Sequence, residues 1–264
     1  MAELLRELDV KIALIDWLYK KGMLSDATII NEMVVANWSR RADLAIANGS
    51  LQAYEIKSDF DSLKRLDGQL KIFNSSFEKV TIVCAPKFTC EVSKRVSSNV
   101  GVVEFQSNNS GVRFKVIQKG RVCSRLNKVV YLGFLLKSEL KDLLNQYGIK
   151  VSNNLHRDRL EILASKLALN KIREFVITSI KNRYHATSNE FLSRLHGNKK
   201  ISINDLDLLS KAKRKNDSLV KFEFKACSNE SLNEYHKVDV DSIVRKYGDD
   251  ISYIPGKVLK RVVN

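Results

Sequence analysis

Two carboxylates and a lysine lie close together between Arg41 and Lys57, and they are residue types that could carry out metal-dependent chemistry. Asp43 precedes an Asn-Gly pair, and Glu55 and Lys57 follow it. Two carboxylates can hold Mg²⁺, which takes oxygen ligands and keeps waters that a phosphate substrate can displace. Such an ion polarises a phosphoryl oxygen and activates a bound water, while a nearby lysine orients that water or stabilises the developing charge. The chemistry to expect is hydrolysis of a phosphate ester.

These residues are expected on two paired strands, residues 42–47 and 51–57. Asn48-Gly49 between two apolar runs is the strongest short-range signal for a β-hairpin. Because strand side chains alternate between faces, Glu55 and Lys57 should point the same way, and Asp43 should reach Glu55 across the hairpin. The alternative is that Glu-x-Lys is only the solvated face of an amphipathic strand.

A helix is predicted next, from Asp61 as N-cap to Ser75, and it could bring a polar side chain to the same place. Gln69 lies beside the apolar stripe of this helix and could face the strand ends. A glutamine in mid-helix is usually a surface residue. Gln69 is a candidate for the site only because the Glu-x-Lys run lies nearby in the sequence. Lys64 and Arg65 are candidates for contact with a phosphate backbone. The apolar stripe consists of Leu63, Leu66, Leu70 and Phe73.

Asp43, the run Glu55-Ile56-Lys57 and Gln69 together resemble the motif of the PD-(D/E)XK nuclease superfamily. The wider string Arg-Ala-Asp-Leu-Ala, followed by Tyr-Glu-Ile-Lys-Ser-Asp-x-Asp-Ser-Leu-x-Arg-Leu, looks like one poorly characterised bacterial branch of it. The resemblance covers residues 1–118. It departs from the common pattern at Ala42, where many members have proline, and at Phe73, where tyrosine is frequent.

The resemblance implies a restriction-endonuclease-like αβββαβ fold and a Mg²⁺- or Mn²⁺-dependent nuclease. In that scheme Asp43, Glu55 and the backbone carbonyl of Ile56 hold the metal. Lys57 orients or activates the attacking water, and Gln69 positions the lysine or the phosphate.

Two further acids are candidates for the same site. Thr28 to Asn37 is predicted as the first strand, and Glu32 at its centre either supplies a third carboxylate or lies on an exposed edge. Many superfamily members carry a glutamate in the first helix that faces the metal. Glu7 is the best-placed candidate for that role, with Glu3 and Asp9 as competitors.

The order of the other predicted elements gives an α/β fold. Apolar residues at helical spacing predict a helix over residues 2–20. Lys79 to Ala85 is a continuous apolar run, typical of a strand buried on both faces. A short helix after Pro86 and strands near 100–105 and 112–118 complete the order.

The net charge of +15 suggests a polyanionic partner, and we expect nucleic acid, with DNA favoured. Residues 1–120 hold 17 Lys/Arg and 14 Asp/Glu, whereas residues 121–264 hold 28 and 16. We therefore predict a nuclease-like domain over 1–120 and a basic, mainly helical domain over 121–264 that carries most of the affinity. The alternatives are that the charge serves solubility, or that the second domain binds a protein partner or a second copy in a homodimer.

Helices are predicted in the second half at Val130–Tyr147, Arg157–Ala168 and Ile172–Tyr184. The first two have the spacing of helix-extended-helix DNA-binding motifs of the SAP type. Lys150, Arg157 and Arg159 are therefore candidates for contact with nucleic acid. The segments that follow are a basic run at 211–215, which is either a solvated loop or a phosphate contact, and a strand-like run at 219–226.

Several classes of protein do not fit the sequence. No apolar run approaches the ~20 residues that span a bilayer, and the first residues lack the apolar core of a signal peptide. The four cysteines form no CxxC pair and the four histidines show no ligand spacing, so neither zinc nor disulfides are expected.

We expect a cytoplasmic, metal-dependent nuclease, acting in phage defence or DNA repair. A catalytically silent nucleic-acid-binding or scaffold protein on the same fold is the alternative. A toxin-like effector that cuts only when a partner releases it would have the same sequence features.

Overall fold

The structure is a computed structural model that describes residues 4–35, 40–108, 111–123, 127–152, 154–196, 201–210, 235–237 and 257–259. The chain divides into two compact units, Met1–Lys215 and Asn216–Asn264. In the second unit, β7 (Tyr235–Lys237) pairs antiparallel with β8 (Lys257–Leu259). The basic run at 211–215 and the predicted strand at 219–226 lie outside the described residues.

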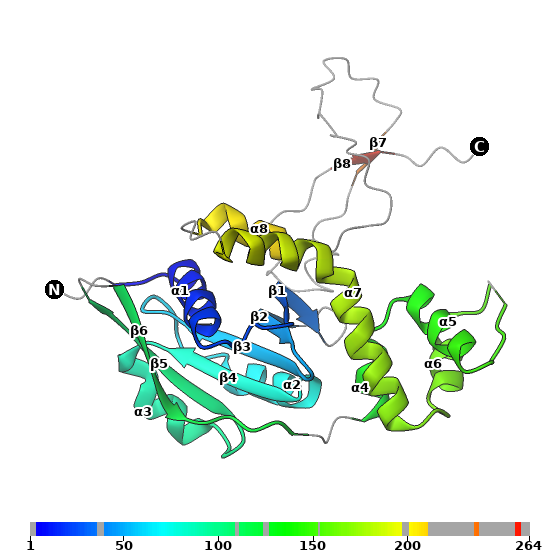
Figure 1. The fold of residues 1–264 in the computed structure, drawn as a ribbon, viewed down its shortest axis with the longest axis horizontal. Helices are drawn as coiled ribbons and strands as arrows, with labels where there is room; N and C mark the ends of the chain where they lie inside the picture. Colours follow the sequence, from blue (N-terminus) through cyan, green and yellow to red (C-terminus); the bar gives the residue numbers. More distant parts are fainter. Residues whose placement is uncertain are drawn as a thin grey trace. The chain divides into compact units, whose positions relative to one another are not determined.

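A mixed sheet is the centre of the first unit (Figure 1). The central strands β3, β4 and β5 are parallel, and the flanking pairs are antiparallel. The prediction of an α/β fold is confirmed. In spatial order the strands are β1 (Thr28–Val35), β2 (Arg40–Ala47), β3 (Leu51–Lys57), β4 (Lys79–Cys84), β5 (Gly101–Asn108) and β6 (Gly111–Gln118).

The predicted hairpin joins β2 and β3. Gly49 has a φ of +64°, a conformation that glycine adopts without steric cost. The Asn48 N–H donates to the Ser50 carbonyl at 3.1 Å, which closes the turn. The register then runs from Ala47–Leu51 to Leu44–Tyr54.

Helices cover both faces of the sheet, and the strands bury side chains on each (Figure 1). α1 (Glu7–Lys20) and α8 (Ile203–Ser210) lie on one face, where Ile46, Tyr54 and Val83 belong to the core. α2 (Leu66–Ser76) and α3 (Pro86–Arg95) lie on the other, with Ala45 and Ile82. Burial on both faces explains the continuous apolar run of β4.

The helices after the sheet share its hydrophobic core, so the boundary predicted near residue 120 differs from the structure. Leu132, Leu144 and Ile180 belong to the same core cluster as Phe73 of α2. The boundary lies instead after Lys215. The helices concerned are α4 (Lys128–Gly133), α5 (Lys137–Gln146), α6 (Arg157–Ala164) and α7 (Leu169–His196).

Glu78 joins the helices to the hairpin by hydrogen bonds. Its buried carboxylate accepts from the Leu51 N–H and the Tyr131 hydroxyl, each at 2.7 Å, and from Arg173 Nε at 2.5 Å. Arg173 also donates to the carbonyl of Gly49 at 2.8 Å. The Glu78 network thus ties α4 and α7 to the turn between β2 and β3.

The single helix predicted from Val130 to Tyr147 is two helices, α4 and α5. The second begins after Leu136, whose N–H donates to the Glu139 carboxylate at 2.7 Å. The helix predicted over 157–168 ends at Ala164, and the one predicted over 172–184 extends over the 28 residues of α7. Within the described part of the chain, none of the helices has the length and apolar character that a membrane span requires.

Arg157 and Arg183 occupy the break between α4 and α5. Arg157 donates to the carbonyls of Leu135 at 2.8 Å and Leu132 at 3.2 Å, and Arg183 donates to the carbonyl of Phe134 at 3.0 Å. Carbonyls left without helical partners need such donors. This structural role of Arg157 differs from the predicted contact with nucleic acid.

Candidate active site

β2 and β3 separate at the residue where the first predicted ligand stands. Their paired register ends at Leu44 and Tyr54. One residue further, the Asp43 carboxylate accepts a hydrogen bond from the Ile56 N–H at 2.6 Å. Because the N–H and C=O of one strand residue point to the same side, the Ile56 carbonyl faces the same opening as Asp43.

Glu55, Lys57 and Gln69 meet at this opening. Glu55 is only 2% exposed, and its Oε1 accepts from Lys57 Nζ at 2.8 Å and from Gln69 Nε2 at 2.5 Å. Its Oε2 and the Gln69 Oε1 are buried without a hydrogen-bond partner among the described residues. A buried carboxylate oxygen without a donor is unfavourable, so this oxygen is suited to a cation.

The pKa of each of the two carboxylates is raised, and the largest cause in both is burial. Burial raises the pKa of Asp43 well above its ordinary value, and the Glu55 and Glu7 charges raise it further. The Ile56 N–H and Lys11 oppose this rise. Burial also raises the pKa of Glu55, against the lowering effect of Lys57 and Gln69. Removal from water is the main cause of both shifts, and strongly perturbed pKa values occur frequently at functional sites.

Of the three acids considered in the first helix, Glu7 is the one associated with the site. Its charge raises the pKa of both Asp43 and Glu55. The Asp9 carboxylate instead accepts from the Arg6 N–H at 3.0 Å at the start of α1. Glu3 lies outside the described residues.

Glu32 forms ion pairs with two cations, Lys11 and Arg41. It has a φ of +57°, which is uncommon for a residue other than glycine, and the paired register of β1 and β2 omits it. Its carboxylate lies 3.6 Å from Lys11 Nζ and 3.0 Å from Arg41. Glu32 is therefore a half-buried, ion-paired acid rather than a solvated edge residue, and its role as a third metal ligand stays a prediction.

The loop after β3 holds α1 in place. The Asp59 carboxylate accepts from the Leu5 N–H at 3.0 Å, and the Asp59 N–H donates back to the Leu5 carbonyl at 3.3 Å. Asp61 was predicted as the N-cap of a helix, but it accepts from the Ser58 N–H at 2.8 Å and closes the loop, so that α2 begins five residues later at Leu66. The loop thus brings Glu7 to the strand ends.

Comparison with known proteins shows the family to which the chain belongs. The family model described as "Bacteriophage P4 protein cII" matches residues 1–210. The chain belongs to the bacteriophage P4 protein cII family. Protein cII of Enterobacteria phage P4 is 90% identical over 263 residues, with both chains covered completely. A solved protein of unknown function from Silicibacter pomeroyi has a TM-score of 0.36 and 13% identity, over 58% of this chain and 99% of its own.

The residues matched by the cII family model include the whole candidate site and the helices up to α8. They end five residues before the first compact unit does. The family model therefore spans the sheet and the helices as one piece, in agreement with their shared core.

Metal ligands in this cII family member would be few. The described residues contain no group of three or more His, Cys, Asp and Glu side chains placed to hold a metal ion. Asp43 and Glu55 supply two carboxylates, and the Ile56 carbonyl is a third oxygen on the same side. Mg²⁺ is usually bound through one or two carboxylates with water and substrate phosphate in the other positions, so this donor set fits it better than zinc.

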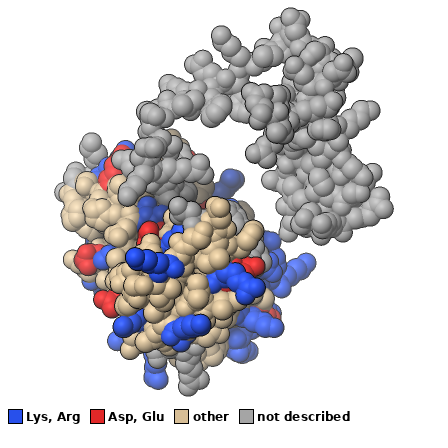
Figure 2. All heavy atoms as spheres, turned by 90° about the vertical axis from the view of Figure 1, so that its right-hand side faces the viewer, with Lys and Arg blue, Asp and Glu red and all other residues tan. Residues whose placement is uncertain are grey.

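Four of the five predicted nucleic-acid contacts have exposed side chains. Lys64 and Arg65 directly precede α2, Lys150 lies between α5 and α6, and Arg159 is on α6. Figure 2 shows the side of the molecule that carries α5 and α6, where Lys and Arg side chains are spread with few carboxylates between them. Arg157 is the exception, because its guanidinium is used within the fold.

Lys11 is a residue that the sequence argument missed. It is completely buried although it is charged. A signal was present, because Lys11 stands three residues before Leu14 and seven before Leu18, on the apolar stripe of α1. A lysine on the buried stripe of a helix needs an anionic partner and so indicates acids nearby.

Proposed function

We propose that this member of the cII family is a Mg²⁺- or Mn²⁺-dependent nuclease built on a restriction-endonuclease-like αβββαβ core. The observation that carries the proposal is the buried, unpartnered Oε2 of Glu55. It belongs to a carboxylate held by Lys57 and Gln69, beside the point where Asp43 interrupts the pairing of two strands. The element order from α1 to β4 also supports it.

The donors that would hold the ion are the Asp43 carboxylate, Glu55 Oε2 and the Ile56 carbonyl. All three are hard oxygen donors, which Mg²⁺ and Mn²⁺ prefer. When bound, a divalent ion polarises a phosphoryl oxygen and makes a coordinated water more acidic. The raised pKa values of the two carboxylates in the metal-free protein agree with a site that gains from an added positive charge.

Lys57 would act on the water or on the phosphate. Its ammonium is buried and held by Glu55 at 2.8 Å, so its direction is fixed before substrate arrives. A fixed donor of this kind stabilises charge that develops in the transition state without a reorganisation cost. Gln69 would act as a positioning residue, because its amide N–H holds Glu55 Oε1 and leaves Oε2 free.

Nucleic acid is the proposed substrate class, with DNA favoured. The charge of +15 supports a polyanionic partner. Exposed Lys64 and Arg65 lie in the segment between the Lys57 strand and the Gln69 helix, where a phosphate backbone could pass. A cytoplasmic location is part of the proposal, and Cys84, Cys90 and Cys123 are free thiols.

A cleavage panel tests the proposal. Single- and double-stranded DNA and RNA, linear and circular, would be incubated with the full chain and Mg²⁺, Mn²⁺ or EDTA. We expect cleavage that needs the metal, and loss of at least about hundredfold in rate for Asp43→Ala and for Glu55→Ala, because each removes charge that holds the ion. Asp142→Ala, which removes an exposed acid on α5, is the matched control. Near-normal cleavage by either site variant would overturn the assignment.

A catalytically silent nucleic-acid-binding or scaffold protein is the second candidate. The observation that favours it is the net charge of +15, which supports binding of a polyanion whether or not the site cleaves it. The same panel separates the two functions. Tight binding of nucleic acid without cleavage in any metal would favour the second.

A further inference from the structure

Lys11 is a charged side chain enclosed between α1 and β1, with no exposed surface. Its Nζ lies 3.1 Å from Glu7 Oε1, 3.0 Å from Asn31 Oδ1 and 3.6 Å from Glu32 Oε1. A buried ammonium is tolerated only where acceptors and opposite charges surround it. Two of these partners are acids that also adjoin the candidate active site.

The Lys11 ammonium is held by partners on both α1 and β1. Glu7 is one helical turn before it, and Asn31 faces it from β1. The Asn31 amide in turn donates to the Leu206 carbonyl of α8 at 3.3 Å, so Asn31 Oδ1 is directed at Lys11. The ammonium therefore stays beside the acids.

Lys11 lies beside the part of β1 that faces Asp43, one of the proposed metal ligands. Asn31 and Met33 of β1 pair with Leu44 and Ala42 of β2, so Glu32, which lies 3.6 Å from Lys11, stands opposite Asp43. In agreement with this placement, Lys11 lowers the pKa of Asp43 against the larger effect of burial. Glu55 is buried, Asp43 is half-buried, and the two buried cations nearby are Lys57, paired with Glu55, and Lys11, paired with Glu7. Lys11 supplies positive charge of the kind that a divalent ion would bring.

We propose that Lys11 is a positioning residue that serves as a resident counter-cation of the active site. It stabilises the acids when no metal is bound, and by the same charge it weakens the binding of a divalent ion. This inference rests on the metal site of the proposed function and adds a control on its affinity. Nucleic acid would then meet a site that fills only at a higher metal concentration.

The test is the Lys11→Met variant of the full chain, which keeps the length of the buried side chain and removes its charge. Thermal unfolding in EDTA and Mn²⁺ binding by isothermal titration calorimetry are measured. We expect the melting temperature in EDTA to fall by roughly 3 °C or more, because acids lose their counter-charge. We expect Mn²⁺ to bind at least about fivefold more tightly, because a like charge has left the site. Lys11→Gln, which can still hydrogen-bond to Asn31, should show the same two changes.

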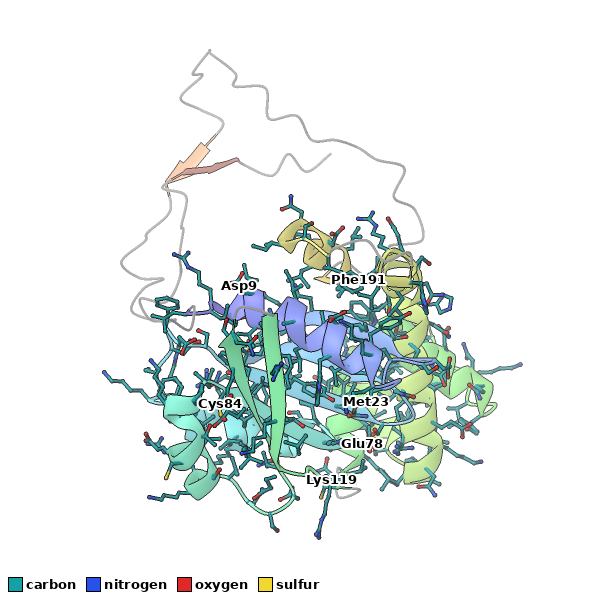
Figure 3. All side chains as sticks on the ribbon, turned by 60° about the vertical axis from the view of Figure 1, so that its left-hand side comes forward. Asp9, Met23, Glu78, Cys84, Lys119 and Phe191 are labelled. Carbon is teal, nitrogen blue, oxygen red and sulfur yellow. The ribbon has the colours of Figure 1, made fainter. Side chains whose placement is uncertain are left out.

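Arg173→Met is the matched control, because it removes a partly buried cation from the Glu78 network. Figure 3 shows Glu78 and Cys84 at opposite ends of β4, and Lys57 pairs with Cys84, so the control lies at the other end of the sheet. It should lower the melting temperature and leave Mn²⁺ affinity unchanged. A purely structural Lys11 would behave like this control.

The outcomes separate the two proposals. Wild-type binding that depends on Asp43, without tighter binding by either Lys11 variant, overturns the role of Lys11 alone. Absence of Mn²⁺ binding in the wild type and in both variants overturns Lys11 together with the metal site. Binding by the variants but not by the wild type supports Lys11 as the obstacle. Failure of both variants to fold even with Mn²⁺ present shows a structural role and overturns the proposal.

Discussion

The Ile56 N–H donates a hydrogen bond of 2.6 Å to the Asp43 carboxylate, directly beyond the last paired position of β2 and β3, Leu44–Tyr54. A side chain takes the place that a strand carbonyl would occupy in a continuing ladder. The two strands therefore diverge with the Ile56 N–H still paired. The opening that results is lined by Glu55 and by the carbonyl of Ile56.

Asp43 should make the stability of the metal-free protein depend on pH. Burial and Glu55 raise the pKa of Asp43 above its ordinary 3.8, so the folded state holds the proton more strongly than the unfolded state. The contribution to stability is complete below the ordinary value and is lost as pH rises through the raised pKa. The melting temperature in EDTA should fall as pH increases above about 4, and Asp43→Asn should flatten this fall. Identical pH profiles for Asp43→Asn and the exposed control Asp142→Asn would contradict the expectation.

Lys57→Arg should not restore the activity lost in Lys57→Ala. Lysine offers a compact ammonium, whereas the planar guanidinium is wider and would displace the water that it should hold. We expect both variants to cleave at least about a hundredfold more slowly than the wild type in Mg²⁺, as for loss of a transition-state donor. Lys64→Arg, at an exposed position, serves as the control. If arginine at position 57 restores most of the rate, the lysine acts only as a general positive charge.

Lys150 and Arg159 should contribute to binding of the phosphate backbone. Each phosphate contact on duplex DNA contributes about 0.9 to the slope of log K against log salt. The double variant Lys150→Ala with Arg159→Ala should reduce the slope by roughly 1.8 and leave the melting temperature unchanged. Fluorescence anisotropy in EDTA over a salt series measures it.

Arg157→Ala is the matched comparison for that double variant. It should lower the melting temperature, because the carbonyls of Leu132 and Leu135 lose their donor. An unchanged salt slope for the double variant would indicate that this basic surface does not bind the backbone. Point variants are needed because the helices share the core of the sheet, so a fragment ending at residue 120 lacks part of that core.

Glu78→Ala should be strongly destabilising without a direct effect on metal binding. It leaves the Leu51 N–H and the Tyr131 hydroxyl unpaired and removes the partner of Arg173. Removing one partner of a buried ion pair costs about 3–5 kcal/mol, which urea unfolding would measure. Glu174→Ala, at an exposed position of α7, should change stability by less than about 0.5 kcal/mol. A loss below about 1 kcal/mol for Glu78→Ala would show that the network adds little to the fold.

The sequence by itself determined the features that depend on near neighbours. Asn48-Gly49 predicts the hairpin because only a few residue pairs adopt the turn at low cost. Strand alternation then places Glu55 and Lys57 on one side, and helical spacing brings Gln69 close to them. The α/β class follows from the order of these local elements.

The tertiary structure alone decided what depends on residues far apart in the chain. Glu78 bonds to Tyr131 and Arg173 across separations of 53 and 95 residues. These bonds tie the later helices to the sheet, although the uneven distribution of charge along the sequence predicted a domain boundary between them. Lys11 becomes a partner of Glu32 only when α1 packs on β1. Arg157 is used inside the fold because α4 ends early and exposes carbonyls. Local propensity carries no information about such contacts, since each arises only after distant elements have packed together.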